Sequence, residues 1–342
     1  MTEVREDLSI YVLPGRTSDP AAGLKEVRDA EAAGFGSVYV SERLDVKDAA
    51  VVCGALTSVT ERIRIGTALI HQGTRHPLTI ASLAATMQSM SGGRFVLGLG
   101  RGIGALAPSL GIPKPTLAGL EQLVSILRRL WAGERVTETG PAGAFRGLRF
   151  SDLPSSPPPI LFGTIGPRGL ELAGRVFDGV ILHPFLTAEA VAASAALVRA
   201  AAEEAGRDPG TVRIVSTLVT APDVAPDRAD IAVRARAISY FQVRGLGELL
   251  VERNGWNPAV LARLRSHPTL AGGRVADTSL TRDRMVPAAE TIPEHWFSDG
   301  AAIGTAAECA ARARDYVAAG ADEILLHGAS PQEAAGIAGM WE

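Results

Sequence analysis

Cysteine is scarce in this chain, which has only Cys53 and Cys309 among its 342 residues. The two lie far apart in the sequence and within helical patterns, so we expect two small buried side chains and neither a disulfide framework nor a zinc site. The sequence also contains no P-loop and no Ser-His-Asp pattern. Phosphoryl and acyl transfer are therefore disfavoured.

The sequence also has no excess of basic residues and no long apolar run. The formal net charge is −3 at pH 7, which argues against a nucleic-acid partner. No stretch approaches the roughly 18 consecutive apolar residues of a membrane-spanning helix. The first residues, MTEVREDLSIYV, are charged and lack the apolar core of a secretion signal. We therefore expect a cytoplasmic protein without a membrane segment.

The sequence does contain eight short apolar runs, most of them separated by helical patterns. Continuous apolar runs are typical of strands that are buried on both faces of a parallel sheet. Eight successive strand–helix units predict an α/β protein, a (β/α)8 TIM barrel formed as a single domain over 1–342. Functional residues should then follow the strands at one mouth of the barrel. The runs lie at 8–12, 37–41, 63–69, 95–100, 159–163, 179–183, 212–219 and 323–327.

The spacing of the runs predicts one long insertion. About a hundred residues separate the seventh run from the eighth, far more than one crossover helix needs. We expect a helical insertion over 222–300 that lies above the barrel mouth as a lid or substrate-selecting element. An external brace or a dimer contact is the alternative. A second irregular stretch, 133–158, is rich in Gly and Pro and is expected to be a loop with a small hairpin.

Two glycine-rich turns follow predicted strands. The turn Gly98-Leu99-Gly100-Arg101-Gly102 can bring backbone N–H groups and an arginine close to an anion. It is not a Rossmann fingerprint, because Ile103 stands where the last glycine would be required. The turn Gly163-Thr164-Ile165-Gly166-Pro167-Arg168 opens a helix whose N-terminus is also suited to an anion. The alternative is that these glycines are needed only for close packing.

Three of the six histidines end or leave predicted strands: His71, His183 and His327. In a barrel these positions converge on one mouth, whereas a single histidine there is more often structural. They do not have metal-ligand spacing, so we expect no metal and favour proton transfer or substrate contact. Glu42 is the only carboxylate that leaves one of the first five strands.

Longer segments of the chain resemble the bacterial luciferase-like superfamily. These are 63–102, 158–183 and 303–327, which contain Thr-Arg-His-Pro, Ser-Gly-Gly-Arg-Phe, Gly-Leu-Gly, Gly-Pro-Arg and Ala-Gly-x-x-x-Asp-Gly. The resemblance is closest to the F420-dependent, methylene-tetrahydromethanopterin-reductase-like branch, and it extends over nearly the whole chain except 222–300. It implies a barrel whose mouth binds coenzyme F420, with FMN as the alternative cofactor. We also expect a homodimer that acts on a small molecule.

The resemblance assigns roles to single residues. The carboxylate after strand 2 contacts the cofactor, which here is Glu42, and a bulge with a non-prolyl cis peptide supports the ring, which here falls at Ala68-Leu69. Combined with the two anion-binding turns, this predicts cofactor contacts from Glu42, Ala68, Leu69, Gly100, Arg101, Gly102, Gly163, Thr164, Ile165, Gly166, Pro167 and Arg168.

Two residues depart from the sugar-phosphate-oxidising relatives. Those relatives have a histidine base after the strand-2 carboxylate, where this chain has Arg43, and a glutamate after the Gly-x-Gly turn, where it has Ile103. A glucose-6-phosphate dehydrogenase role is therefore disfavoured. The guanidinium of Arg43 stays protonated, so it cannot serve as a base. It can, however, hold an anionic substrate. We predict that His71, with His183 in reserve, handles protons, and that Arg43 and His327 contact the substrate.

These observations favour an F420-dependent oxidoreductase that moves a hydride between the deazaflavin C5 and an unidentified organic substrate. The first alternative is an FMN-dependent luciferase-like monooxygenase, which needs a reductase partner. The second is a non-catalytic flavin-fold binding protein that has kept the barrel and lost its chemistry.

Overall fold

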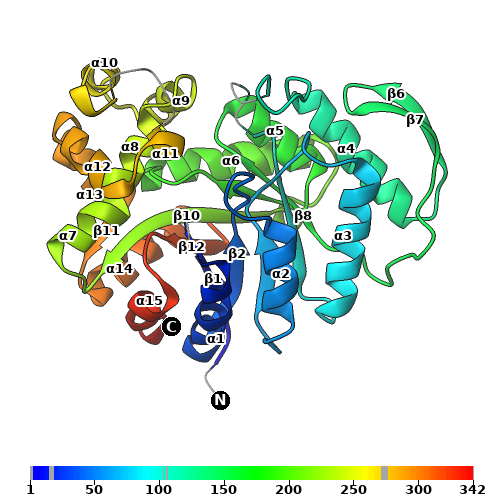
Figure 1. Ribbon diagram of the computed structural model, residues 1–342, viewed down its shortest axis with the longest axis horizontal. Helices are drawn as coiled ribbons and strands as arrows, with labels where there is room; N and C mark the ends of the chain where they lie inside the picture. The colour runs from blue at the N-terminus through cyan, green and yellow to red at the C-terminus, as the bar shows by residue number, and fades with distance from the viewer. Residues whose placement is uncertain (1–2, 15–18, 103, 105–106, 271–275, 342) are drawn as a thin grey trace.

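The structure, a computed structural model, describes residues 3–14, 19–102, 104, 107–270 and 276–341. Its centre is a closed ring of eight parallel strands, in which β9 pairs with β10 and so joins the two ends of the sheet (Figure 1). The predicted (β/α)8 barrel is confirmed. In ring order the strands are β1 (Arg5–Tyr11), β2 (Phe35–Val40), β3 (Arg64–Thr67), β5 (Phe95–Gly100), β8 (Ile160–Thr164), β9 (Gly179–Leu182), β10 (Arg213–Pro222) and β12 (Glu323–His327).

The third strand is interrupted, although its sequence predicts one continuous run. The peptide bond between Ala68 and Leu69 is cis, as the resemblance implied. The chain then resumes as the short strand β4 (Ile70–His71), which pairs with β5 so that His71 lies opposite Gly100. This break carries the chain across the barrel mouth and places His71 there.

Helices cover the outside of the ring, and several of them begin at a recognisable capping residue. Thr116 and Thr187 accept hydrogen bonds from the first turns of their helices, and Thr305 forms a capping box with Glu308. Gly34 ends the first helix with a φ of 89°, a conformation that favours glycine. The barrel helices are α1 (Gly23–Ala33), α2 (Ala49–Thr57), α3 (Pro77–Met90), α4 (Leu117–Trp131), α5 (Pro167–Val176), α6 (Ala188–Glu204), α14 (Ala306–Ala318) and α15 (Pro331–Gly339).

The long connection between β10 and β12 differs in part from the prediction. The seventh strand continues to Pro222, and the inserted chain returns as an extra strand, β11 (Ala301–Gly304), which pairs with the end of β10. The sequence analysis did not predict β11. The helices between β10 and β11 gather in one lobe beside the barrel, shown in yellow and orange in Figure 1. They are α7 (Pro226–Ala229), α8 (Ala235–Phe241), α9 (Leu246–Arg253), α10 (Ala259–Arg265), α11 (Ala276–Ser279), α12 (Arg282–Met285) and α13 (Glu294–Gly300).

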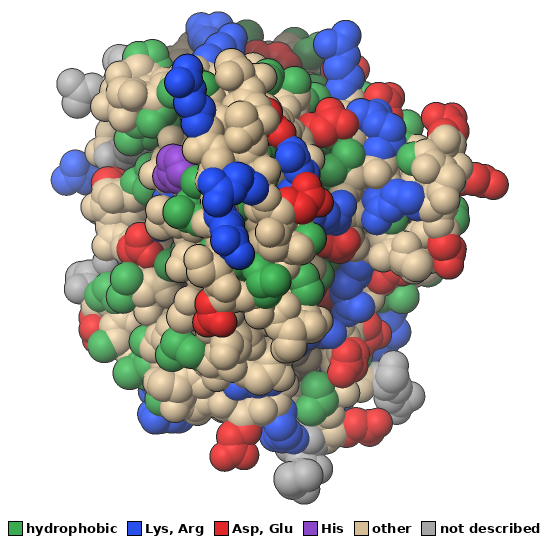
Figure 2. All heavy atoms as spheres, turned by 90° about the vertical axis from the view of Figure 1, so that its right-hand side faces the viewer, with side chains coloured by type: hydrophobic (Ala, Val, Ile, Leu, Met, Phe, Trp, Pro, Cys, Tyr) green, Lys and Arg blue, Asp and Glu red, His purple; other side chains and the backbone are tan. Residues whose placement is uncertain are grey.

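The hairpin expected within 133–158 is present as β6 (Val136–Gly140) and β7 (Gly143–Leu148), on the side of the molecule opposite the lobe. Figure 2 shows that side of the molecule, where basic and acidic side chains are interspersed. Cys53 and Cys309 are both buried free thiols, as expected. None of the described helices is long and apolar enough to span a membrane.

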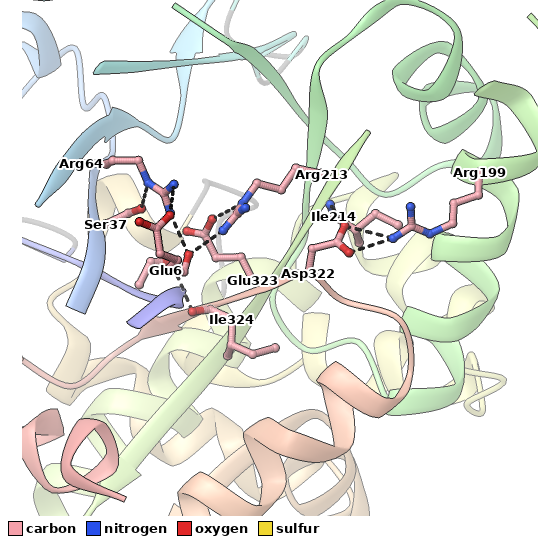
Figure 3. A network of polar contacts seen from close by, with 10 residues as sticks. Glu6, Ser37, Arg64, Arg199, Arg213, Ile214, Asp322, Glu323 and Ile324 are labelled. Atoms are coloured by element: carbon pink, nitrogen blue, oxygen red, sulfur yellow. Dashed lines mark hydrogen bonds and ion pairs between the residues drawn. The ribbon is translucent and has the colours of Figure 1, made fainter. Parts of the chain in front are cut away.

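Ion pairs close the barrel at the N-terminal ends of the strands (Figure 3). The buried carboxylate of Glu323 pairs with Arg213 at 2.6 Å, and Arg64 bonds to Glu6 at 2.9 Å and to the Ser37 hydroxyl at 3.0 Å. Above this polar floor, apolar and aromatic side chains fill the interior. They are Tyr11, Tyr39, Ala68, Val96, Leu161, Ile181, Val215 and Leu325.

Candidate active site

A cavity of about 490 Å³ opens at the C-terminal ends of the strands, which is within the usual size range of small-molecule sites. Three sources contribute its walls: the ends of β2, β4, β5 and β9, the loop after β5, and the inserted helices. The lining residues are Glu42, Arg43, Leu44, Asp45, His71, Arg101, Gly102, Ala107, Ser109, Leu110, Ile112, Pro115, His183, Ser239, Tyr240, Val243, Leu246 and Asp277. The structure thus brings together six predicted site residues: Glu42, Arg43, His71, Arg101, Gly102 and His183.

Glu42 is buried and forms an ion pair with Arg75. Its other oxygen, Oε2, accepts a hydrogen bond from the backbone N–H of His71 at 3.3 Å. Arg75 also pairs with Asp48 at 2.6 Å. Glu42 therefore anchors the chain directly after the cis peptide. The sequence analysis gave Arg75 no role, although it stands in the Thr-Arg-His-Pro motif that carried the resemblance.

His71 lies at the wall beside Gly102, whose φ of 75° lets the backbone pass next to the imidazole ring. A side chain at Gly102 would crowd that ring, because a Cβ there would be 3.1 Å from His71 Cγ. Burial lowers the pKa of His71, against an opposing effect of Glu42. The imidazole is therefore neutral at pH 7 and can accept a proton.

His183 lines the same cavity from the end of β9. Its Nδ1 lies 2.9 Å from the Pro184 carbonyl oxygen, and its ring meets Tyr240 of α8 edge-on, with 4.7 Å between centroids. Burial lowers the pKa of His183 to about 4. The insertion thus contacts a strand-end histidine directly.

His327 does not line the cavity, although it was predicted to contact substrate. It is buried, with Nε2 2.6 Å from Nη1 of Arg236. Its ring also packs against Tyr11, whose hydroxyl donates to the Ala68 carbonyl at 3.2 Å. Neither Tyr11 nor Arg236 was predicted from the sequence, because their partners lie on distant segments of the chain.

Arg43 lines the cavity but is already paired. Its guanidinium bonds to Asp277 Oδ2 at 2.5 Å and to the Asp277 carbonyl at 3.2 Å. Asp277 Oδ1 accepts a second bond, from Arg282, at 2.7 Å. The predicted anion-binding arginine is therefore part of a cluster that the sequence did not reveal.

The two glycine-rich turns differ in position. Gly100 and Gly163 pack against Leu69 of the bulge, where a Cβ at Gly163 would overlap the leucine side chain. This close packing agrees with the steric alternative considered for the glycines. Arg101 is exposed and lines the cavity, whereas Arg168 is exposed at the start of α5 outside its lining. The departure at Ile103 lies outside the described residues.

In the described part of the chain, no group of three or more His, Cys, Asp or Glu residues is arranged to hold a metal ion. The groups that line the mouth include the neutral imidazoles of His71 and His183, arginine–carboxylate pairs and apolar side chains.

Comparison with known proteins assigns the family. A family model described as luciferase-like monooxygenase matches residues 9–323. The chain belongs to this family. It is 31% identical over 274 residues to the 5,10-methylenetetrahydromethanopterin reductase of Methanolobus tindarius, which covers 77% of this chain and 82% of the relative. It is 36% identical over 165 residues to the F420-dependent glucose-6-phosphate dehydrogenase of Beutenbergia cavernae, covering 44% of this chain and 49% of that protein.

Solved structures of two F420-dependent enzymes share the fold. The coenzyme F420-dependent tetrahydromethanopterin reductase from Methanopyrus kandleri superposes with a TM-score of 0.80 at 19% identity, over 98% of this chain and 97% of that one. An F420-dependent secondary alcohol dehydrogenase in complex with an F420-acetone adduct gives 0.74 at 20% identity, with the same coverage. At these identities the likeness shows the fold alone.

Proposed function

We propose that the chain is an F420-dependent oxidoreductase that transfers a hydride between the deazaflavin C5 and a small organic substrate. The observation that carries this proposal is the 31% identity to a methylenetetrahydromethanopterin reductase over most of both chains. The shorter matches to F420-dependent dehydrogenases point to the same cofactor.

The residues present fit a deazaflavin. The cavity has apolar walls for a flat ring, formed by Ala107, Leu110 and Ile112 on one side, and exposed Arg101 at its edge for an anionic tail. The first turn of α5 has no side-chain cap at Gly166, so its N–H groups suit a phosphate. When bound, F420 supplies the hydride acceptor or donor, and the protein supplies position and environment.

Different residues of the chain position the cofactor, exclude water, transfer the proton and select the substrate. Glu42 and Tyr11 hold the bulge from two sides, through His71 N–H and the Ala68 carbonyl, so this segment would offer a bound deazaflavin a fixed support. The apolar walls exclude water from the reacting face. Neutral His71 takes or returns the substrate proton at an imidazole nitrogen. The inserted helices select the substrate through Tyr240, Val243 and Leu246.

Binding of the anionic tail of F420 should depend on Arg101 and Arg168. Changing Arg101 or Arg168 to Ala should weaken F420 binding by about 1.5–3 kcal/mol where a charged hydrogen bond is lost. Titration of F420 fluorescence measures this, with the exposed Arg146→Ala of the distant hairpin as the control. Unchanged affinity in both variants would mean that the tail runs elsewhere.

Catalysis itself is tested by turnover. The protein with reduced F420 should reduce a tetrazolium dye in steady state, and it should do so far faster than an equal amount of reduced F420 alone. F420 binding without any turnover would favour the non-catalytic alternative. The cytoplasmic location and the homodimer stay predictions, and sedimentation of the purified chain tests the latter.

A further inference from the structure

Three arginines and one carboxylate meet where the inserted helices join the cavity. Asp277 is shared between Arg43 and Arg282, one on each carboxylate oxygen, at 2.5 and 2.7 Å. The third arginine, Arg236, is buried, and no described carboxylate forms an ion pair with it. This arginine cluster (Arg43, Arg236, Arg282 and Asp277) therefore carries a formal excess of two positive charges.

The environment of Arg236 makes that excess significant. Its polar partners are neutral: Nη1 faces His327 Nε2 at 2.6 Å, and Nε bonds to the Ala232 carbonyl at 3.3 Å. Arg236 follows a five-residue π-helical turn, Asp230–Arg234, of a kind that is frequent at functional sites. A buried charge without a counter-ion is costly, and proteins usually pair it.

Titratable neighbours respond to this positive field. Burial and the charge of Arg282 lower the pKa of Arg236 to about 10, so it remains charged at pH 7. Burial and then Arg43 lower the pKa of Lys47 to about 8. The pKa of His327 is also lowered, by burial and then by Arg236 and Arg282. These directions agree with the count of formal charges.

The cavity wall next to the cluster presents hydrogen-bond donors. Tyr240 lines the cavity and contacts Arg236. Because an arginine side chain can only donate hydrogen bonds, the Tyr240 hydroxyl accepts from it and can still donate its own proton. Arg43 adds its guanidinium. The Ser239 hydroxyl is already engaged, because it accepts from Arg282 at 3.1 Å and donates to the Arg236 carbonyl at 2.6 Å. The nearest other carboxylates at the cavity are Glu42, which pairs with Arg75, and exposed Asp45.

We propose that this end of the cavity binds the anionic group of the substrate, a carboxylate or a phosphate monoester attached to an apolar body. The negative group would lie against Arg43 and Tyr240, with Arg236 behind them supplying the uncompensated charge. The apolar body would face Leu44, Val243 and Leu246 on the remaining wall. The inference rests on the proposed function, because it describes the substrate side of the same cavity.

The test uses three probes that each contain six carbon atoms: hexanoate, hexyl phosphate and the uncharged hexanamide. Each is added to the purified full chain, and the melting temperature is measured against concentration, since a ligand that binds the folded state stabilises it. We expect both anions to raise the melting temperature and hexanamide to leave it unchanged. The stronger of the two anions identifies carboxylate or phosphate as the preferred group. Equal effects of all three probes would overturn the proposal.

Arg236→Met separates a ligand-binding role from a structural one. If Arg236 is uncompensated without ligand, its replacement should maintain or raise the melting temperature of the free protein while weakening anion binding at least tenfold. The matched control is Arg234→Met, which removes an arginine of the same segment that already pairs with Glu294 and Asp230. That variant should keep anion binding. Undiminished anion binding by Arg236→Met would contradict the proposal.

Two further arms remove the remaining ambiguities. If Arg236→Met does not fold, Arg43→Met at the cavity wall should show the same tenfold loss, and an unchanged affinity there overturns the inference. F420 and a deazaflavin without the charged tail are then titrated into wild type and Arg236→Met. A tenfold loss for F420 alone would assign the cluster to the cofactor tail and overturn a substrate site. Anion binding by a wild-type protein that does not bind F420 would refute the proposed function and leave the anion site standing.

Discussion

Replacing His71 with Ala should lower turnover by about 100-fold or more and leave F420 affinity nearly unchanged, as general acid–base groups do. The imidazole lines the cavity directly after the bulge, and burial keeps it neutral at pH 7. His71 and His183 are the imidazoles among the residues that line the cavity, and of the two His71 comes directly after the bulge. Steady-state rates and fluorescence titration on the same samples separate the two effects.

The exposed His295 provides the control, because His295→Ala removes an imidazole that does not line the cavity. That variant should retain full turnover. If His71→Ala also retains turnover on a genuine substrate, His71 only packs against Gly102. The search would then move to His183.

Acid should destabilise the fold through buried neutral histidines. Burial lowers the pKa of His71, His183 and His327 below the ordinary 6.5. The unfolded chain therefore binds protons that the folded chain rejects as pH falls. The stabilisation is complete above pH 6.5 and is lost towards each folded-state pKa, about 4 for His183. For His183 this amounts to about 2–3 kcal/mol of the free energy of unfolding between pH 6.5 and 4.5.

Urea unfolding at pH 7.0 and at pH 4.5 measures this loss. His183→Asn retains a short donor for the Pro184 carbonyl and cannot titrate, so its free energy of unfolding should fall less over the same interval. His295→Asn changes an exposed histidine and should follow the wild type. Equal pH dependence in wild type and His183→Asn would show that His183 does not contribute.

The sequence predicted the barrel because strands buried on both faces leave a local signal, the continuous apolar run. It also placed His71 and His183 correctly, since the ends of parallel strands meet at one mouth. The helix α15 and the strand β11 were not predicted from the sequence. β11 is only four residues long and is stabilised by pairing with the end of β10, some eighty residues earlier in the chain.

The site was less predictable because its polar contacts join distant segments. Arg43 and Asp277 are 234 residues apart, and Arg236 and His327 are 91 apart. Nothing in the local pattern around Asp277 indicates a partner. Arg236 stands in an otherwise apolar helix. Its charge at that position was the one local sign that its side chain needs a buried polar partner.

Equilibrium binding of F420 and of FMN to the purified chain tests the central claim most directly. Fluorescence titration should show one F420 site per chain with an affinity at least 100-fold greater than for FMN, because exposed Arg101 and the uncapped start of α5 suit a longer, more highly charged tail. Tight FMN binding without detectable F420 binding would contradict the account and favour the FMN-dependent monooxygenase.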